Sequence, residues 1–170
     1  MATNTKFVVV APDNISSITA IFAFENNVVN MTRQEFSTIL AEYRKEYGPT
    51  IKEVCIHSGC LPSDMYRIEK SKHNYNMQKS LDYIKAIGAY LELRSGNGEP
   101  KIITEYNQLV KCVVDERTQS NYTQRSLAKT IGCSYVTLGL FESYKTIVTI
   151  DTLLKIGEAL GFELNVKQNE

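Results

Sequence analysis

The sequence has no excess of charge of either sign. It carries 19 Lys and Arg against 19 Asp and Glu, so the formal net charge is zero. Residues 33–95 hold ten basic and eight acidic side chains, and residues 104–170 hold seven and eight. Binding to phosphates depends on Lys and Arg. An anionic partner would therefore have to be held by a few placed donors and by dimerisation, because neither half of the chain is strongly basic.

Long apolar runs are also missing. No run approaches the ~20 residues that a membrane helix needs. Lys6 precedes only a short apolar run at residues 7–11, which is too short for the core of a secretory signal. We therefore expect a cytoplasmic protein without a membrane partner.

The sequence lacks the usual patterns of metal sites and catalytic sites. Its cysteines and histidines are Cys55, Cys60, Cys112, Cys133, His57 and His73. Their spacing does not match a paired C-x2-C zinc pattern, so the cysteines are interpreted as small buried apolar groups. The glycines of residues 95–98 are not followed by the Lys-Ser/Thr of a phosphate loop. We predict no metal, no cofactor and no enzymatic activity.

One segment of the chain occurs twice. Residues 50–93 align with residues 123–166 without a gap, with nine identities in 44 pairs. The identities include Thr50/Thr123, Gly59/Gly132, Cys60/Cys133, Glu69/Glu142 and Lys72/Lys145. The step along the chain from Thr50 to Thr123 is called the repeat spacing below. Repeats of this kind indicate two copies of one small unit. Each unit of about 65 residues is near the lower limit for an independent core, so the two are expected to lean on one another.

The first copy is predicted to contain four helices and a strand over residues 32–94. Thr32 and Thr50 each precede a glutamate by three residues, which is the spacing of a capping box. Gly48 and Pro49 end the first helix. A third helix begins near Ser63, a fourth covers about residues 77–88, and residues 90–93 alternate as a strand does.

The second copy is predicted over residues 104–170, with the same plan. Residues 95–103 are predicted to be a linker, because residues 95–100 contain two glycines and a proline and no apolar residue. The four helices are assigned Thr104, Thr123, Ser134 and Asp151 as caps, and residues 162–166 form a strand. The strands that follow the two copies could form a small sheet, together with a predicted strand within residues 6–11.

Residues 1–31 lie outside the repeat. Their role is not predicted, and an arm, a dimerisation element or a cover for the repeats all fit.

A helix-turn-helix pattern stands out in the second copy. A small residue allows the third helix to cross closely, a glycine permits the tight turn, and a serine caps the third helix. The pattern is carried by Gln124, Ala128, Gly132, Ser134, Leu138 and Glu142. Over about 45 residues, this pattern resembles the Cro/phage-repressor family of helix-turn-helix proteins, also called the Xre family. The resemblance implies a mainly α-helical protein of two tandem lambda-repressor-like units, with short β elements at the N-terminus and after each unit.

In that family the third helix lies in the major groove, with its first residues on base edges. The resemblance implies that Gln124 touches a phosphate and braces the first residues of the reading helix. Arg125 and Lys129 are candidates for backbone contacts, and Val136 and Thr137 for contact with thymine methyl groups. The predicted DNA-binding residues of the second copy are Gln124, Arg125, Ser134, Tyr135, Val136, Thr137, Gly139 and Lys145.

The first copy is interpreted as a degenerate version of the same unit. Ile51 replaces Gln124, Leu61 replaces the Ser134 cap, and Asp64 adds a negative charge where DNA would lie. The remaining candidates for DNA contact are Ser63, Tyr66, Arg67, Lys70 and Lys72. The second copy is therefore favoured as the reader, and the first as a scaffold or as the reader of a different half-site.

The resemblance implies sequence-specific binding of double-stranded DNA by a transcriptional regulator of phage, mobile-element or antitoxin type. Two linked units could replace the dimer of single-unit proteins, and a homodimer through the N-terminal segment is an open alternative. A different function also fits the fold: a protein-interaction module, such as an antitoxin or adaptor, that binds a protein partner. The sequence does not define the operator sequence, and it does not show whether the regulator represses or activates transcription.

Overall fold

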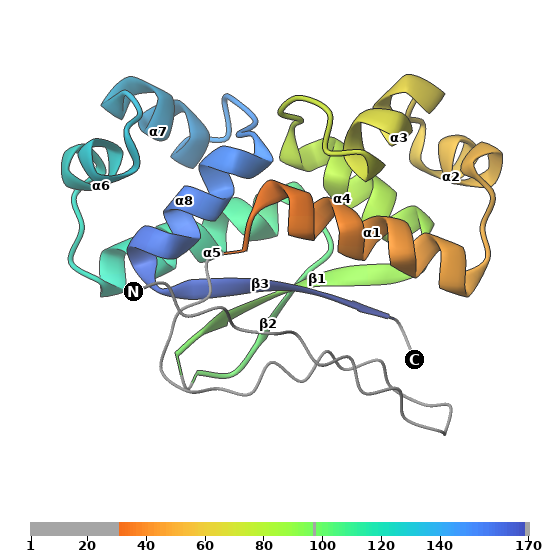
Figure 1. Cartoon of the computed structure of the whole chain (residues 1–170). Helices are drawn as coiled ribbons and strands as arrows, with labels where there is room; N and C mark the ends of the chain where they lie inside the picture. Colours follow the sequence, from red (N-terminus) through yellow and green to blue (C-terminus); the bar gives the residue numbers. More distant parts are fainter. Residues whose placement is uncertain (1–30, 97, 169–170) are drawn as a thin grey trace, which may run out of the picture.

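The computed structural model of the protein describes residues 31–96 and 98–168. Within these residues, eight helices lie on one face of a three-stranded sheet (Figure 1). The mainly α-helical class predicted from the sequence is therefore correct. The elements are, in order, α1 (Arg33–Tyr47), α2 (Ile51–Ser58), α3 (Pro62–Glu69), α4 (Met77–Ala86), β1 (Ala89–Ser95), β2 (Lys101–Ile103), α5 (Tyr106–Gln119), α6 (Gln124–Ile131), α7 (Tyr135–Glu142), α8 (Ile150–Leu160) and β3 (Phe162–Gln168).

Local capping signals explain where several helices begin. Thr32 and Thr50 both form complete capping boxes, each with the glutamate three residues later. Thr123 and Ser134 accept hydrogen bonds from the backbone of the first turns of α6 and α7. These four predicted caps are confirmed.

Two other predicted caps are wrong. Helix α5 has Glu105 at its cap position, and Thr104 instead donates its hydroxyl to Gln108 at 3.1 Å. Helix α8 is capped by Thr149, whose side chain accepts from the backbone of Thr152, while Asp151 lies inside the first turn. In both cases neighbouring polar residues compete for one role, and the exact start of the helix decides between them.

The sheet has the strand order β2-β1-β3, and all pairings are antiparallel. The predicted strands at residues 90–93 and 162–166 are present as β1 and β3. Residues 101–103, which the sequence assigned to a linker, instead form β2 and pair with residues 91–93. The glycines of this segment therefore serve a turn back onto β1. The predicted N-terminal strand lies outside the described residues.

The register of β1 on β3 has a specific relation to the repeat. Glu92 pairs with Asn165, which is its own counterpart one repeat spacing later in the chain. On either side, Leu91 pairs with Val166 and Leu93 pairs with Leu164. Leu91 and Leu164 are counterparts in the repeat, and so are Leu93 and Val166. The two strands are thus arranged so that exchanging them leaves the pairing unchanged.

Helices from both halves of the chain share one apolar core. Phe36 and Leu40 on α1, Leu109 and Val113 on α5, and Leu91 on β1 are all fully buried in the same cluster. Fully burying such a side chain stabilises the fold by roughly 1.5–3 kcal/mol. Because the core is continuous, packing holds the helices of residues 33–86 against those of residues 106–160.

Candidate nucleic-acid interface

Helices α6 and α7 are joined by a tight turn. Gly132 ends α6 in the left-handed region, at φ 70°, which glycine adopts without a steric penalty. Ser134 then starts α7 as its cap. Ala128 is 2 % exposed at the crossing of the two helices, where a larger side chain would push them apart. Gly132 and Ser134 thus form the turn and the cap that a helix-turn-helix requires.

The first turn of α7 is exposed on one side and anchored on the other. Leu138 and Phe141 are buried, whereas Tyr135 and Val136 are 53 % and 52 % exposed. The guanidinium of Arg125, on α6, lies 5.3 Å from the centroid of the Tyr135 ring, within the range of a cation–π contact. The structure therefore brings Arg125 and Tyr135 together at the start of α7.

Ser134 and Thr137 are linked to one another. Their hydroxyl groups lie 2.9 Å apart, and Ser134 also accepts from the backbone N–H of Thr137 at 3.0 Å. Both side chains are exposed. The methyl group of Thr137 takes no part in this contact and can pack against an apolar group.

Gln124 contacts the second half of α7. Its amide donates from Nε2 to Oε2 of Glu142 at 2.8 Å. The side-chain oxygen Oε1 of Gln124 lies beside Gly139, in the middle of α7. The sequence placed Gln124 against the first residues of the helix, and that detail is wrong because Glu142 draws the amide to the other end.

A buried ion pair holds α5 and α7 together. Arg117 donates to Glu142 through Nε at 2.6 Å and through Nη2 at 2.8 Å, which is bidentate geometry. Its Nη1 donates to the carbonyl of Tyr122, just before α6. The side chain of Glu142 is only 6 % exposed. It accepts three hydrogen bonds, two from Arg117 and one from Gln124. This pair fixes the orientation of the helix-turn-helix.

The same pair occurs in the first half of the chain. Arg44 on α1 contacts Glu69 at the end of α3, and its Nη1 donates to the carbonyl of Pro49. Burial alone would raise the pKa of Glu69, but hydrogen bonds from Arg44 and Tyr83 outweigh it and lower the pKa. The hydroxyl of Tyr83 donates to Glu69 at 2.7 Å. Tyr83 thus supplies a donor to Glu69, as Gln124 does to Glu142.

Sequence reasoning missed both arginines. It noted the two glutamates as a shared column of the repeat but assigned them no partner. Arg44 and Arg117 are themselves separated by the repeat spacing, and each lies shortly before its aligned segment begins. Extending the alignment backwards without a gap would have revealed them.

Asp64 corrects a second expectation. It was predicted to place a repelling charge against DNA, but it is 7 % exposed and accepts from Nζ of Lys79 at 2.6 Å. The backbone N–H of Leu61 also donates to it, at 3.3 Å. Leu61 has no polar side chain to cap α3, so Asp64 turns inward at this helix start. The contact with Lys79 lowers the pKa of Asp64.

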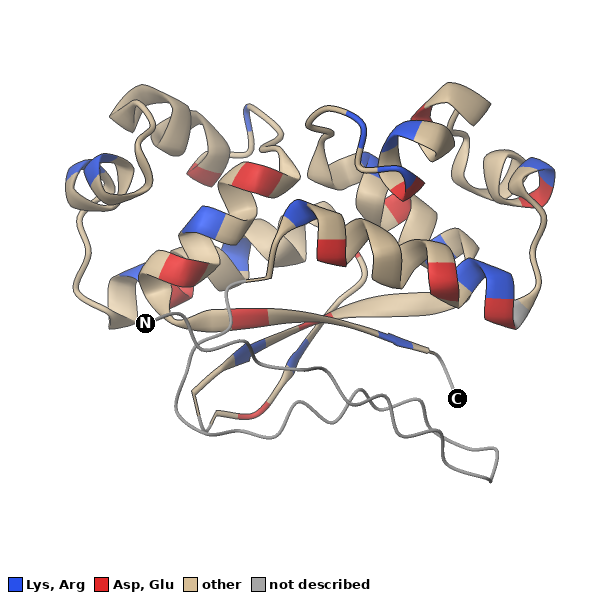
Figure 2. Cartoon of the chain, viewed as in Figure 1, with Lys and Arg blue, Asp and Glu red and all other residues tan. Residues whose placement is uncertain are grey.

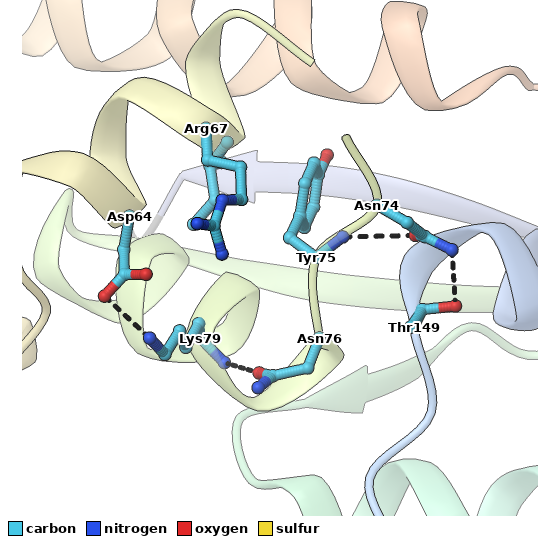
Figure 3. Close-up of a pocket in the computed structure, with 8 residues that line it drawn as sticks. Asp64, Arg67, Asn74, Tyr75, Asn76, Lys79 and Thr149 are labelled. Carbon is cyan, nitrogen blue, oxygen red and sulfur yellow. Dashed lines mark hydrogen bonds and ion pairs between the residues drawn. The ribbon is translucent and has the colours of Figure 1, made fainter. Parts of the chain in front are cut away.

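The candidate residues of the first half line the outer side of α3 and the loop after it. Ser63, Arg67 and Lys72 are all exposed. Arg67 lines a cavity of about 220 Å³. In Figure 3 its side chain lies between those of Asp64 and Tyr75. Burial raises the pKa of Tyr75 to about 12. Asp64 forms its ion pair with Lys79 here, so its charge is neutralised from within the protein.

Lys72 and Lys145 lie in loops of the same shape. Ser71 and Tyr144, which precede them, both adopt left-handed backbone, with φ 52° and 61°. The backbone N–H of each lysine donates to a carbonyl five residues earlier, at 3.0 Å and 2.8 Å. These two loops, each of which carries at least one basic residue, lie next to one another between the two helix pairs (Figure 2).

Part of the chain matches a known family. Residues 115–166 match the helix-turn-helix family model. The matched residues, less than a third of the chain, include all of α6, α7 and α8. This match agrees with the predicted resemblance at the level of the helix-turn-helix. No curated protein and no solved structure matches the chain.

The described part of the chain contains neither a membrane-spanning helix nor a metal-binding cluster. Among residues 31–96 and 98–168, no helix is long and apolar enough to span a bilayer. Within the same residues, no cluster of three or more His, Cys, Asp or Glu side chains is placed to bind a metal ion.

Proposed function

We propose that the protein is a transcriptional regulator that binds double-stranded DNA in a sequence-specific manner, with α7 in the major groove. One observation carries this proposal. Tyr135 and Val136 are exposed at the start of a helix whose opposite side is anchored by Leu138 and Phe141. A helix that is fixed from below and offers its first residues outward has the geometry of a recognition helix. The family match over residues 115–166 supports it.

The reading contacts would be mostly apolar. Helix α7 contains no Lys or Arg, so its base contacts would come from Tyr135, Val136 and the methyl group of Thr137. Such groups pack against the methyl group of thymine. Phosphate contacts would come from Arg125 and Lys145 on neighbouring segments, with backbone groups at the helix starts. Thymine-containing sites should therefore be enriched.

We infer further that residues 32–94 form a second, degenerate unit of the same kind. Its support is the recurrence of one buried pair, Arg44 with Glu69 and Arg117 with Glu142, at the same separation in both halves. Two features make this unit degenerate. Ile51 stands at the position of Gln124 and is 42 % exposed, and Leu61 gives α3 no side-chain cap.

The test is selection of bound sequences from a pool of random duplexes, followed by fluorescence anisotropy on the enriched duplex at ~50 and ~200 mM salt. Two phosphate contacts, from Arg125 and Lys145, predict an affinity that falls roughly 12-fold between these concentrations, and every further contact makes the fall steeper. The variant Tyr135→Ala with Val136→Ala should keep its circular dichroism spectrum and lose preference for the enriched duplex. Absence of salt-dependent binding by the wild-type chain would contradict the proposal.

One observation favours the alternative of a protein-binding module. The exposed apolar residues of α7 and of the loop after it lie close in the sequence and include Tyr135, Val136, Leu140, Tyr144 and Ile147. Exposed apolar side chains gathered in this way are typical of a protein interface. In that case the random-duplex selection would enrich nothing, and Leu140→Asp would abolish capture of the protein partner while leaving the fold intact.

A further inference from the structure

The two helix-turn-helix segments are related by a local two-fold axis. The pairing of β1 and β3, centred on Glu92 and Asn165, is unchanged when the strands are exchanged. A second contact has the same property: Asn76 and Thr149, which are also counterparts in the repeat, form an antiparallel bridge. Contacts that a residue makes with its own counterpart are the mark of a two-fold interface between identical subunits.

The hydrogen bonds at this bridge repeat the symmetry. The N–H of Met77 donates to the carbonyl of Val148 at 2.9 Å, and the N–H of Ile150 donates to the carbonyl of Tyr75 at 2.9 Å. Each donor and each acceptor has its counterpart one repeat spacing away. Two separate contacts are therefore consistent with one axis. Helices α3 and α7 both lie on the side of the molecule that faces away from the sheet (Figure 1).

The spacing between α3 and α7 is fixed by the fold. The core is continuous across the axis, and Arg33 on α1 forms an ion pair with Asp151 on α8 at 2.6 Å. The hydroxyl of Tyr43 on α1 donates to the carbonyl of Val166 on β3. Single-unit proteins place two helices in major grooves about one turn, ~34 Å, apart by forming a dimer, whereas here both helices belong to one chain.

The surfaces of the two helices differ in chemistry. Helix α3 and its loop carry the exposed cations Arg67, Lys70 and Lys72, where α7 and its loop carry Leu140, Ser143 and Lys145. The nearby carboxylates of Asp64 and Glu69 are neutralised by Lys79 and Arg44, so they do not cancel these cations. The α3 side therefore suits phosphates, and the α7 side suits base edges with methyl groups.

We propose that one chain occupies two successive half-sites of a duplex, with α7 reading bases in one and α3 holding the phosphates of the other. This inference rests on the proposed DNA binding. It predicts an asymmetric operator, in which a defined half-site is followed by about one helical turn of DNA that is bound with little regard to sequence. It also predicts a complex of one chain with one duplex.

The experiment uses the full chain and the enriched duplex. Sedimentation velocity should give one chain per duplex, and cutting the duplex back to the defined half-site should weaken binding strongly. Arg67→Ala with Lys72→Ala should weaken binding to all duplexes alike, by roughly 50-fold at ~0.1 M salt, and should lower the salt slope by about 1.8. The enriched motif should not change.

The matched control is Lys85→Ala with Lys111→Ala. It removes two exposed lysines of α4 and α5, which belong neither to α3 and α7 nor to the loops after them, and should bind as the wild type does. Two chains on a palindromic motif, or wild-type affinity in the Arg67/Lys72 variant, would overturn the two-half-site inference and leave the proposed DNA binding intact. Absence of any binding by the wild type would overturn both.

Discussion

Asn76 and Thr149 form an antiparallel bridge, and each of them caps a helix. The side chain of Asn76 accepts from the backbone of Lys79, and that of Thr149 accepts from the backbone of Thr152. The amide of Asn74 also donates to the Thr149 hydroxyl at 2.9 Å (Figure 3). The starts of α4 and α8 are thus tied to one another across the middle of the molecule.

Thr149→Ala should destabilise the protein by about 1–2 kcal/mol, because it removes a helix cap together with the contact from Asn74. Urea unfolding measures this loss as a lower midpoint with an unchanged slope. Thr130→Ala is the matched control. Thr130 is exposed inside α6, where alanine is a better helix former, so its free energy of unfolding should be unchanged or slightly higher. Equal effects of the two changes would contradict the capping role.

Glu142→Gln should lower the free energy of unfolding by about 3 kcal/mol or more, because Arg117 would keep its charge in a buried place without a carboxylate partner. Arg117 and Glu142 are 14 % and 6 % exposed. The double change Arg117→Met with Glu142→Leu should recover much of the loss, since no uncompensated charge remains. A cost below about 1 kcal/mol for Glu142→Gln would show that solvent reaches the pair.

Asp64 should make stability depend on pH. Its pKa lies below the ordinary value of 3.8, first because of the hydrogen bond from Lys79 and in spite of its burial. A carboxyl whose pKa is lowered by folding contributes stability above its unfolded pKa, and that contribution is lost as pH falls through the folded pKa. The unfolding free energy of Asp64→Asn, compared with the wild type, should therefore be lower at pH 7, and the difference should shrink below about pH 4.

Lys79→Met provides the check on that cause. Without its lysine partner Asp64 should titrate at a higher pH, and the acid loss of stability should begin earlier than in the wild type. A difference between Asp64→Asn and the wild type that stays constant from pH 7 to pH 2.5 would contradict a titrating role for Asp64.

Val136→Ala should change DNA recognition without changing stability. The side chain is 52 % exposed, so truncation should alter the free energy of unfolding by less than about 0.5 kcal/mol. Loss of contact with a base should cost about 1 kcal/mol of binding free energy, which is a roughly fivefold weaker affinity for the enriched duplex. The affinity for a scrambled duplex should not change. Ile102→Ala, at a residue 57 % exposed on β2, is the control and should leave both affinities unchanged.

Much of the local structure could be predicted from the sequence. The capping boxes at Thr32 and Thr50 and the cap at Ser134 depend on residues within three positions of each other, so the sequence contains the whole signal. Gly132 marks the turn between α6 and α7 for the same reason. The repeat was also visible, because finding it needs only a comparison of the chain with itself.

Other features were settled only by the tertiary structure. Arg117 meets Glu142 and Arg44 meets Glu69 across 25 residues, so their contact depends on how two helices cross. Lys79 neutralises Asp64 only because α4 packs behind α3, which reversed the meaning of that carboxylate. The sequence determined the helices through short-range signals. The register of β1 on β3 and the core shared by both halves were decided by tertiary packing, because long-range pairing leaves no local signal in the chain.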